Sequence, residues 1–185
     1  MKTAKSSMFL FGIIFTLLFF ITASLSYSQD KAITQTKELQ DKTTPADALQ
    51  MLKDGNDRFV QNVMFQRNLP EQMHATAKGQ YPFAIVLSCI DSRVAPEITF
   101  DEGLGDIFFF FLTGNFVNDD ILGSMEFACK VTGAKLILVM GHTNCGAIKG
   151  AIDDAQLGNI TQMLTKIKPA VEKTNYDGEK SSKNY

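Results

Sequence analysis

The chain has 185 residues, which is enough for one domain with a substantial core. Its contents of 45% hydrophobic and 21% charged residues are ordinary for a globular protein. The formal net charge of −2 becomes −4 without Lys2 and Lys5, and this acidic balance argues against nucleic acid or another polyanion as a partner.

The first 28 residues have the layout of a secretory signal peptide. Lys2 and Lys5 precede an apolar run from Met8 to Ala23, and small and polar residues follow through Ser28. We therefore expect cleavage after this segment and a secreted or periplasmic protein that no longer contacts a membrane. An uncleaved membrane anchor is the alternative, because the apolar run lies near the lower limit of ~17–25 residues for a bilayer span.

Residues 29–43 are polar and show no periodicity, so we predict a linker or tether there, with the folded domain spanning residues 44–185. Thr44-Pro45-Ala46-Asp47 is typical of a helix N-terminus, with Thr as N-cap and Pro in the first turn. Apolar residues then recur at helical spacing and predict one apolar helix face, formed by Leu49, Leu52, Phe59 and Val63.

Three apolar runs have the length and composition of buried strands: Phe83–Leu87, Ile107–Leu112 and Leu136–Met140. The second run is nearly all aromatic, which suits a strand buried on both faces. Helical patterns lie between and after these runs, near Pro96, from Asn118 to Gly133, from Gly146, and from Ile160 to Val171. This alternation predicts an α/β fold with a mostly parallel central β-sheet flanked by helices.

Two of the predicted strands are followed by residues of the types that bind zinc in proteins. Cys89 follows the first strand, and His142 and Cys145 follow the third. Sites form at the carboxyl ends of the strands in open α/β sheets. Three Cys/His ligands leave a fourth position open for water, as in catalytic zinc sites, so we predict one catalytic Zn²⁺ per subunit. The other histidine, His74, is predicted to lie on the surface.

Asp91 and Arg93 follow Cys89 at alternate positions. A zinc-bound water loses a proton near neutral pH and provides hydroxide as a nucleophile. Arg93 can hold Asp91 ionised through a forked hydrogen bond, and Asp91 can then accept the proton of the hydroxide and orient it. A purely structural salt bridge is the alternative for this pair.

The chain has three cysteines, and the oxidising compartment that an exported protein enters favours disulfides. A Cys89–Cys145 disulfide is therefore an alternative, although it would explain neither His142 nor the Asp91/Arg93 pair. A redox or transfer nucleophile at Cys89 is another, and it predicts activity without metal. Cys129 lies in a helical pattern and is predicted to be a buried small hydrophobic residue.

The motif C-x-D-S-R at residues 89–93, followed by H-x-x-C at 142–145, resembles the signature of the β-class carbonic anhydrases. The resemblance runs from about residue 48 to residue 154, and it includes Leu52–Phe59, Pro96-Glu97, Gly105–Phe108, Gly114-Asn115 and Cys145–Gly150. It implies zinc-dependent, reversible hydration of carbon dioxide to bicarbonate and a proton. In this resemblance Cys89, His142 and Cys145 hold Zn²⁺, and Asp91 with Arg93 forms the catalytic dyad.

The same resemblance implies a substrate pocket at a dimer interface and therefore a homodimer or tetramer. The residues it assigns to this pocket are Gln80, Phe108, Thr113, Phe127 and Gly146, the last through its backbone N–H. Gln80 is expected to serve the site of the partner subunit, whereas Phe108 and Phe127 are also consistent with plain core aromatics. In some members the counterpart of Asp91 becomes a fourth zinc ligand and closes the site.

The chain departs from the family pattern in two respects. Phe111 stands where the family usually has an arginine, and Val86 stands where bicarbonate-gated members have a tryptophan, so we predict no such gating. Fewer residues follow Cys145 than in the family, which leads us to expect that the C-terminal part of the domain is missing. The alternatives for function are a zinc hydrolase of carbonyl sulfide or carbon disulfide and a non-catalytic, zinc-stabilised binding module.

Overall fold

The computed structural model describes residues 33–175, 177–178 and 181–183. The predicted signal peptide lies outside these residues. Within the described ranges, no helix is long and apolar enough to cross a membrane. The described residues before the predicted domain boundary at residue 44 belong to the same compact unit as the residues after it.

Three parallel strands form the central sheet in the order β2-β1-β3. They are β1 (Ala84–Cys89), β2 (Ile107–Leu112) and β3 (Leu136–Met140). In the register of the sheet, Ala84 lies opposite Ile107 on one side and Leu136 on the other. The parallel α/β fold predicted from the sequence is confirmed.

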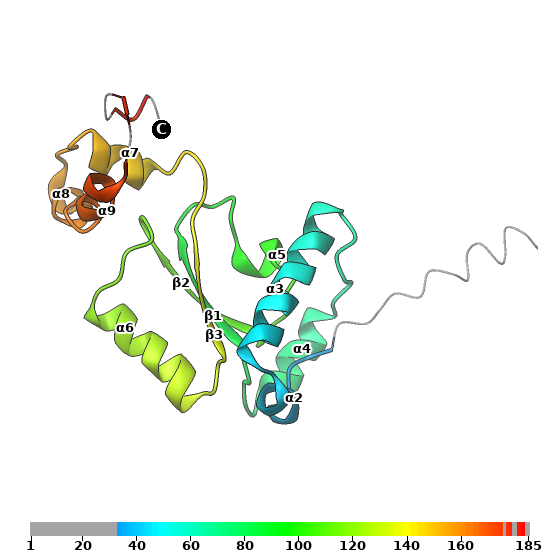
Figure 1. Cartoon of the computed structure of the whole chain (residues 1–185). Helices are drawn as coiled ribbons and strands as arrows, with labels where there is room; N and C mark the ends of the chain where they lie inside the picture. The colour runs from blue at the N-terminus through cyan, green and yellow to red at the C-terminus, as the bar shows by residue number, and fades with distance from the viewer. Residues whose placement is uncertain (1–32, 176, 179–180, 184–185) are drawn as a thin grey trace, which may run out of the picture. The chain divides into compact units, whose positions relative to one another are not determined.

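The described helices are α2 (Lys37–Lys42), α3 (Pro45–Val60), α4 (Leu69–Thr76), α5 (Pro96–Thr99), α6 (Asp119–Glu126), its π-helical continuation η1 (Phe127–Val131), α7 (Gly146–Ile152), α8 (Gly158–Leu164) and α9 (Lys168–Lys173). Alternate residues of a strand point to opposite faces of a sheet. Ala84 and Val86 of β1 therefore pack with α3, whereas Ile85 and Leu87 pack with α6. Helices α3 and α6 lie on opposite sides of the sheet, and α7, α8 and α9 gather beyond one end of it (Figure 1).

Only β1 is buried along its whole length. The prediction that the other two strands are also buried on both faces is wrong, because β2 and β3 are the edges of the described sheet. Their exposure alternates, and Phe109 and Phe111 of β2 are 45% and 42% exposed. An aromatic run favours a strand, but it does not distinguish a central strand from an edge strand.

Helix α3 begins as predicted, with a capping box between Thr44 and Asp47. Its predicted apolar face is only partly correct, because Leu49 and Phe59 are exposed and the buried residues include Ala48, Leu52 and Gly55. A Cβ on Gly55 would lie 1.7 Å from the Phe100 carbonyl oxygen, so only glycine permits this approach of α3 to the end of α5.

The prediction of a tether over residues 29–43 is wrong for its C-terminal part. Thr36 caps α2, and the buried Gln40 of this helix fixes it to the domain. The Gln40 amide Nε2 donates hydrogen bonds of 2.8 Å to the carbonyl oxygens of Pro82 and Thr132. A buried polar anchor of this kind leaves no hydrophobic periodicity in the sequence, which explains why the pattern indicated a tether.

The single C-terminal helix predicted from Ile160 to Val171 is two helices, α8 and α9. Pro169 lies in the first turn of α9, and proline has no N–H to donate to the carbonyl oxygen four residues earlier, so α8 cannot continue unbroken through this position. The chain therefore turns before α9, and Leu164 and Ile167 become part of the core near Cys145. Helix α4 was not predicted; it begins at the N-cap Asn68, and it carries the exposed His74.

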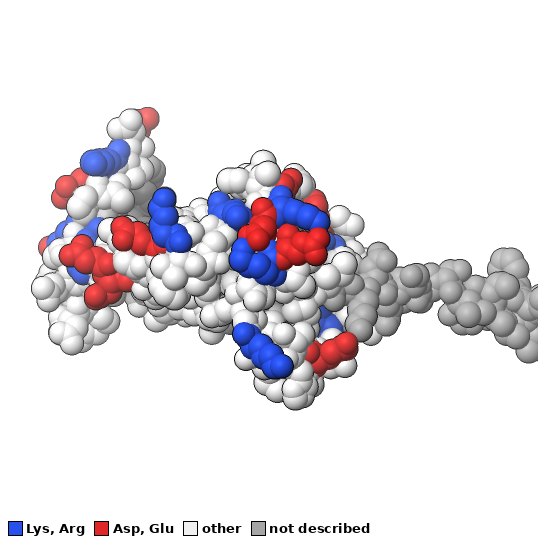
Figure 2. Space-filling model, turned by 90° about the horizontal axis from the view of Figure 1, so that it is seen from below, with Lys and Arg blue, Asp and Glu red and all other residues white. Residues whose placement is uncertain are grey.

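Acidic and basic side chains lie next to one another on the face shown in Figure 2. Some of the exposed charges form pairs along α2, where Lys37 contacts Asp41 and Lys42 contacts Glu38. Exposed pairs of this kind contribute little stability because water and salt screen them.

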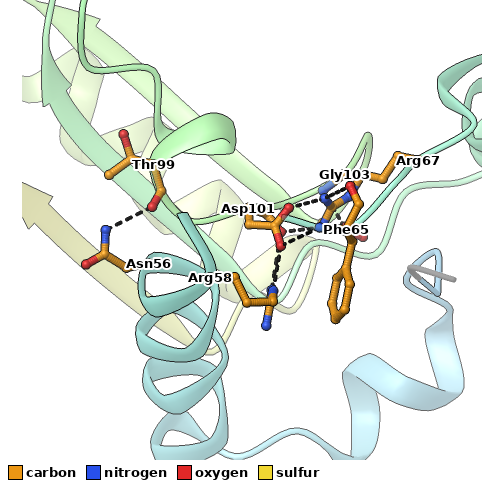
Figure 3. A network of polar contacts seen from close by, with 8 residues as sticks. Asn56, Arg58, Phe65, Arg67, Thr99, Asp101 and Gly103 are labelled. Carbon is orange, nitrogen blue, oxygen red and sulfur yellow. Dashed lines mark hydrogen bonds and ion pairs between the residues drawn. The ribbon is translucent and has the colours of Figure 1, made fainter. Parts of the chain in front are cut away.

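A buried charge network differs from these exposed pairs. The carboxylate of Asp101 is fully buried and accepts hydrogen bonds from the guanidinium groups of Arg58 and Arg67 and from the Phe65 backbone N–H (Figure 3). The Arg58 guanidinium also lies 4.1 Å from the centre of the Phe65 ring. One carboxylate thus holds the loop after α3 against the end of α5.

Substitution Asp101→Asn leaves two arginines without their buried anion. We expect it to lower the free energy of unfolding by about 3–5 kcal/mol, the usual cost of breaking a buried ion pair. Urea denaturation measures this change. Asp41→Asn makes the same chemical change in the exposed pair on α2 and is expected to change stability by less than about 0.5 kcal/mol. Equal effects of the two substitutions would contradict a stabilising role for the buried Asp101 carboxylate.

A second group of carboxyls lies near this network. Burial, and then the charge of Asp106, raises the pKa of Glu102 to about 8 from an ordinary value of 4.5. Asp106 is also buried, which raises its pKa, and it accepts hydrogen bonds from the backbone N–H groups of Gly103 and Gln35. The folded chain therefore holds a proton on Glu102 at neutral pH.

This raised pKa predicts a pH-dependent stability. The unfolded chain releases the Glu102 proton near pH 4.5, whereas the folded chain keeps it until about pH 8, so stability falls as pH rises between these values. The expected loss is on the order of 1 kcal/mol per pH unit. Urea denaturation of Glu102→Gln from pH 5 to 9 is expected to show a shallower decline, with the exposed Glu38→Gln as the matched control. Parallel curves for Glu102→Gln and the unsubstituted chain would rule this out.

Candidate metal centre

The carboxyl ends of β1 and β3 bring together the three side chains that the sequence singled out. Cys89 is the last residue of β1, and His142 and Cys145 lie in the turn between β3 and α7. The ligand atoms of the three residues all lie within 4.8 Å of one another. Both sulfurs belong to buried residues, so the cluster lies inside the fold and not on its surface.

The sulfur geometry fits a metal ion and not a disulfide. The Sγ atoms of Cys89 and Cys145 are 3.8 Å apart, and both cysteines are free. A disulfide would require a separation of about 2.05 Å. A tetrahedral zinc ion with Zn–S bonds of about 2.3 Å places two sulfurs about 3.8 Å apart. The structure therefore disagrees with the disulfide alternative and fits the predicted zinc site.

The ring of His142 is also oriented so that one of its nitrogens can bind a metal ion. Its Nδ1 lies 2.9 Å from the Thr143 carbonyl oxygen and 3.5 Å from Oδ2 of Asp91. Its Nε2 is buried and has no hydrogen-bond partner within the described part of the chain. With the proton on Nδ1, the lone pair of Nε2 is free to bind a metal. A buried ring nitrogen with no hydrogen-bond donor beside it is suited to bind a metal ion.

The surroundings of Cys89 favour the thiolate. Burial raises the pKa of this thiol, but hydrogen bonds from the Gly114 and Asp91 backbone N–H groups and the neighbouring His142 ring outweigh it, so the pKa is lowered. The Gly114 nitrogen lies 3.5 Å from the sulfur. Cys89 in turn raises the pKa of His142. Thiolates are the form that binds metal.

Arg93 holds Asp91 through the predicted fork. The guanidinium Nε lies 2.9 Å from Oδ1 of Asp91 and Nη2 lies 2.6 Å from Oδ2, while the Arg93 backbone N–H also donates to Oδ1. These hydrogen bonds hold the pKa of Asp91 well below its usual range. Asp91 is therefore an ionised carboxylate beside the cluster, paired with Arg93 and not grouped with the three ligand atoms.

A cavity of about 370 Å³ opens beside the cluster. Thr113 and Gly146, which the resemblance assigns to the substrate pocket, line this cavity together with Cys89, Asp91 and His142. Much of the remaining wall is apolar and comes from the C-terminal helices and the residues before them, chiefly Leu157, Ile160 and Met163. The sequence pattern marked Ile160 and Met163 as helix-face residues, and no local signal indicated that this face borders the site.

Three residues assigned to the pocket do not line this cavity in a single chain. Gln80 is exposed and precedes the amino end of β1. Phe108 packs in the core between β2 and α6, and Phe127 is 54% exposed on η1. Their role at the site therefore stays a prediction that requires a second subunit.

Comparison with known proteins identifies the family. The family model for carbonic anhydrase matches residues 84–185. The chain belongs to the β-class carbonic anhydrases. "Carbonic anhydrase 2" of Mycobacterium tuberculosis is 38% identical over 142 residues, which cover 74% of this chain and 69% of that protein.

Solved structures agree with this assignment. The β-carbonic anhydrase of the fungal pathogen Aspergillus fumigatus superimposes with a TM-score of 0.52 at 26% identity, covering 69% of this chain and 60% of that one. A tetrameric β-carbonic anhydrase from Sordaria macrospora gives a TM-score of 0.51 at 24% identity, covering 60% and 62%. The chain thus spans less than two thirds of the length of these two β-carbonic anhydrases.

The departures from the β-carbonic anhydrase pattern have clear places in the fold. Val86 is fully buried in β1 on the α3 side of the sheet. Phe111 lies on the partly exposed side of β2, where its ring centre is 5.0 Å from that of Phe109. An aromatic pair therefore stands where the family usually has a charged residue, and the absence of bicarbonate gating stays a prediction.

The two histidines of the chain provide a test of the metal centre. His142→Ala is expected to weaken zinc binding by about 100-fold or more, because loss of a direct ligand should cost at least as much as loss of an outer-shell partner. His74→Ala removes the exposed histidine on α4 and is expected to leave one zinc ion per chain. Zinc content after dialysis against a chelator measures both; equal retention by the two variants would exclude His142 as a ligand.

Proposed function

We propose that this β-carbonic anhydrase chain binds one Zn²⁺ per subunit and catalyses the reversible hydration of carbon dioxide to bicarbonate and a proton. The observation that carries the proposal is the convergence of Cys89, His142 and Cys145 beside the Asp91–Arg93 ion pair. Zinc, when bound there, would lower the pKa of a coordinated water towards neutrality and so supply a nucleophile.

Asp91 acts in this proposal as an acceptor beside the reacting oxygen. An ionised carboxylate has lone pairs and no proton to donate, so it accepts an O–H hydrogen bond and turns the lone pair of that oxygen towards the substrate. Arg93 maintains this state, because its guanidinium and its backbone N–H both donate to Asp91. The Arg93 side chain is largely exposed, so it positions Asp91 from the solvent side.

The cavity suits a small, uncharged substrate. Carbon dioxide has no net dipole, and apolar walls such as those of Leu157, Ile160 and Met163 hold it without competing hydrogen bonds. The backbone N–H of Gly146, at the start of α7, and the Thr113 hydroxyl are the proposed polar contacts for the oxygens of bicarbonate. The cavity walls thus favour entry of the neutral substrate, and the polar end receives the charged product.

A homodimer or tetramer is part of the proposal. The outer edge of β2 pairs with no other described strand, and its Ile-Phe-Phe-Phe-Phe-Leu sequence has none of the charges or prolines that protect exposed edges. The Sordaria macrospora relative is tetrameric. We propose that Gln80, Phe108 and Phe127 take part in a substrate pocket through contact with a second copy of the chain.

Export of the protein is likewise proposed, from the pattern of residues 1–28 alone.

Stopped-flow measurement of carbon dioxide hydration by the zinc-loaded chain tests the proposed activity. We expect a zinc-dependent rate that Asp91→Asn lowers by about 100-fold or more, the typical contribution of a positioned proton acceptor. Asp54→Asn, an exposed acid on α3, is the matched control and is expected to retain the full rate.

The outcomes separate the parts of the proposal. A zinc-bound chain that hydrates no carbon dioxide would refute the proposed activity. A full rate in Asp91→Asn would instead leave the activity standing and reduce the Asp91–Arg93 pair to a structural salt bridge.

A further inference from the structure

One dipeptide outside the ligand set contacts the segments that carry the ligands. Gly114 and Asn115 follow β2, the strand that supplies no ligand. The Gly114 backbone N–H donates a hydrogen bond of 3.5 Å to Sγ of Cys89. The Asn115 side-chain amide donates to the carbonyl oxygen of Met140, the last residue of β3. The loop after β2 therefore bonds to the ends of both ligand-bearing strands.

Strand order makes this contact specific to the site. Because β1 lies between β2 and β3, the bond from Asn115 to Met140 passes over the carboxyl end of β1, where Cys89 lies. Met140 is only two residues before His142 in the chain. A fixed Met140 carbonyl thus restricts where the His142 turn begins.

Gly114 is suited to its position for two reasons. Its φ angle is +80°, in the left-handed region that favours glycine. A Cβ at this position would lie 2.5 Å from Cδ1 of Ile167 and 3.0 Å from Cβ of Ala147. Ala147 lies in the first turn of α7, directly after the ligand turn. Glycine lets the backbone N–H reach a buried sulfur between these neighbours.

We infer that Gly114-Asn115 is a positioning element for the metal ligands, in which the Gly114 N–H orients Sγ of Cys89 and the Asn115 amide fixes the start of the His142 turn. Hydrogen bonds from outer-shell groups orient metal ligands and commonly change metal affinity by 10–100-fold when they are lost. The inference rests on the proposed zinc site and adds two residues from β2's loop that act on zinc only through its ligands.

The test compares two asparagines on the same loop in the full chain. Asn115→Ala removes the bond to Met140, whereas Asn118→Ala removes the N-cap of α6, where the Asn118 side chain accepts from the Ile121 N–H. Asn118→Ala thus controls for a loss of stability that does not touch the ligand turn. The measurements are zinc affinity by competition with a chelator and the visible absorption spectrum of the cobalt-substituted protein, which reports the geometry of the ligands.

Asn115→Ala is expected to weaken zinc binding by about 10-fold or more and to shift the cobalt spectrum, while Asn118→Ala leaves both unchanged. Asn115→Asp, which keeps the size but places a carboxylate against the Met140 carbonyl, is expected to behave like Asn115→Ala. Unchanged zinc affinity and cobalt spectrum in Asn115→Ala would overturn the inference.

The proposed function fails separately from this inference. A chain that binds zinc and loses affinity in Asn115→Ala, yet hydrates no carbon dioxide, would sustain the positioning role and refute the activity. If the chain hydrated carbon dioxide but Asn115→Ala left its zinc affinity unchanged, the proposed activity would stand and the positioning role would be refuted. If the unsubstituted chain bound no zinc, both would be overturned.

Discussion

The candidate site depends on the parallel pairing of β1 with both of its neighbours. Every residue of β1 is buried, and its two ladders fix its register against β2 and β3. If the register of β1 shifted by one residue, the side chains that face α3 would face α6 and the reverse. Cys89 is therefore held at the carboxyl edge of the sheet by the core itself. Since β3 runs in the same direction, its following turn delivers His142 and Cys145 to the same edge, and the ligands converge without a long flexible loop.

Single side-chain amides join the segments around β1 and β3 at both ends of the sheet. At the amino end, Gln40 of α2 bonds to the carbonyl oxygens of Pro82 and Thr132, in the segments that lead into β1 and β3. At the carboxyl end, Asn115 bonds to Met140 across the end of β1. The charge network of Asp101 adds rigidity in the loops that join α3, α5 and β2. These polar contacts hold the segments that flank the three strands in place, including those around the cavity at the carboxyl edge of the sheet.

Local patterns predicted the parts of this structure that local physics decides. The three strands, the capped start of α3 at Thr44 and the Cys89 and His142 motifs all lie where the sequence indicated. The docking of α2 was not predictable, because Gln40 is polar and its carbonyl partners lie far away in the chain. Whether a strand lies at the centre or the edge of the sheet depends on strand order, which periodicity does not encode. The same holds for the cavity wall, where Ile160 of α8 lines the site through tertiary packing that the helical pattern does not encode.

The ligand set also explains why the loop after β2 belongs to the site. Two thiolates place more negative charge on a metal than imidazoles would, which weakens it as a Lewis acid. At Cys89, burial alone would worsen this, since it raises the pKa of the thiol and leaves a thiolate poorly solvated. The Gly114 N–H, the His142 ring and the Asp91 N–H together reverse that effect and bring the pKa of Cys89 below its ordinary value. The same hydrogen bonds withdraw charge from the sulfur and fix one of its lone pairs in direction. The hydrogen bond from Gly114 therefore contributes both to the orientation of the Cys89 sulfur and to the moderation of its charge, and it requires glycine at position 114.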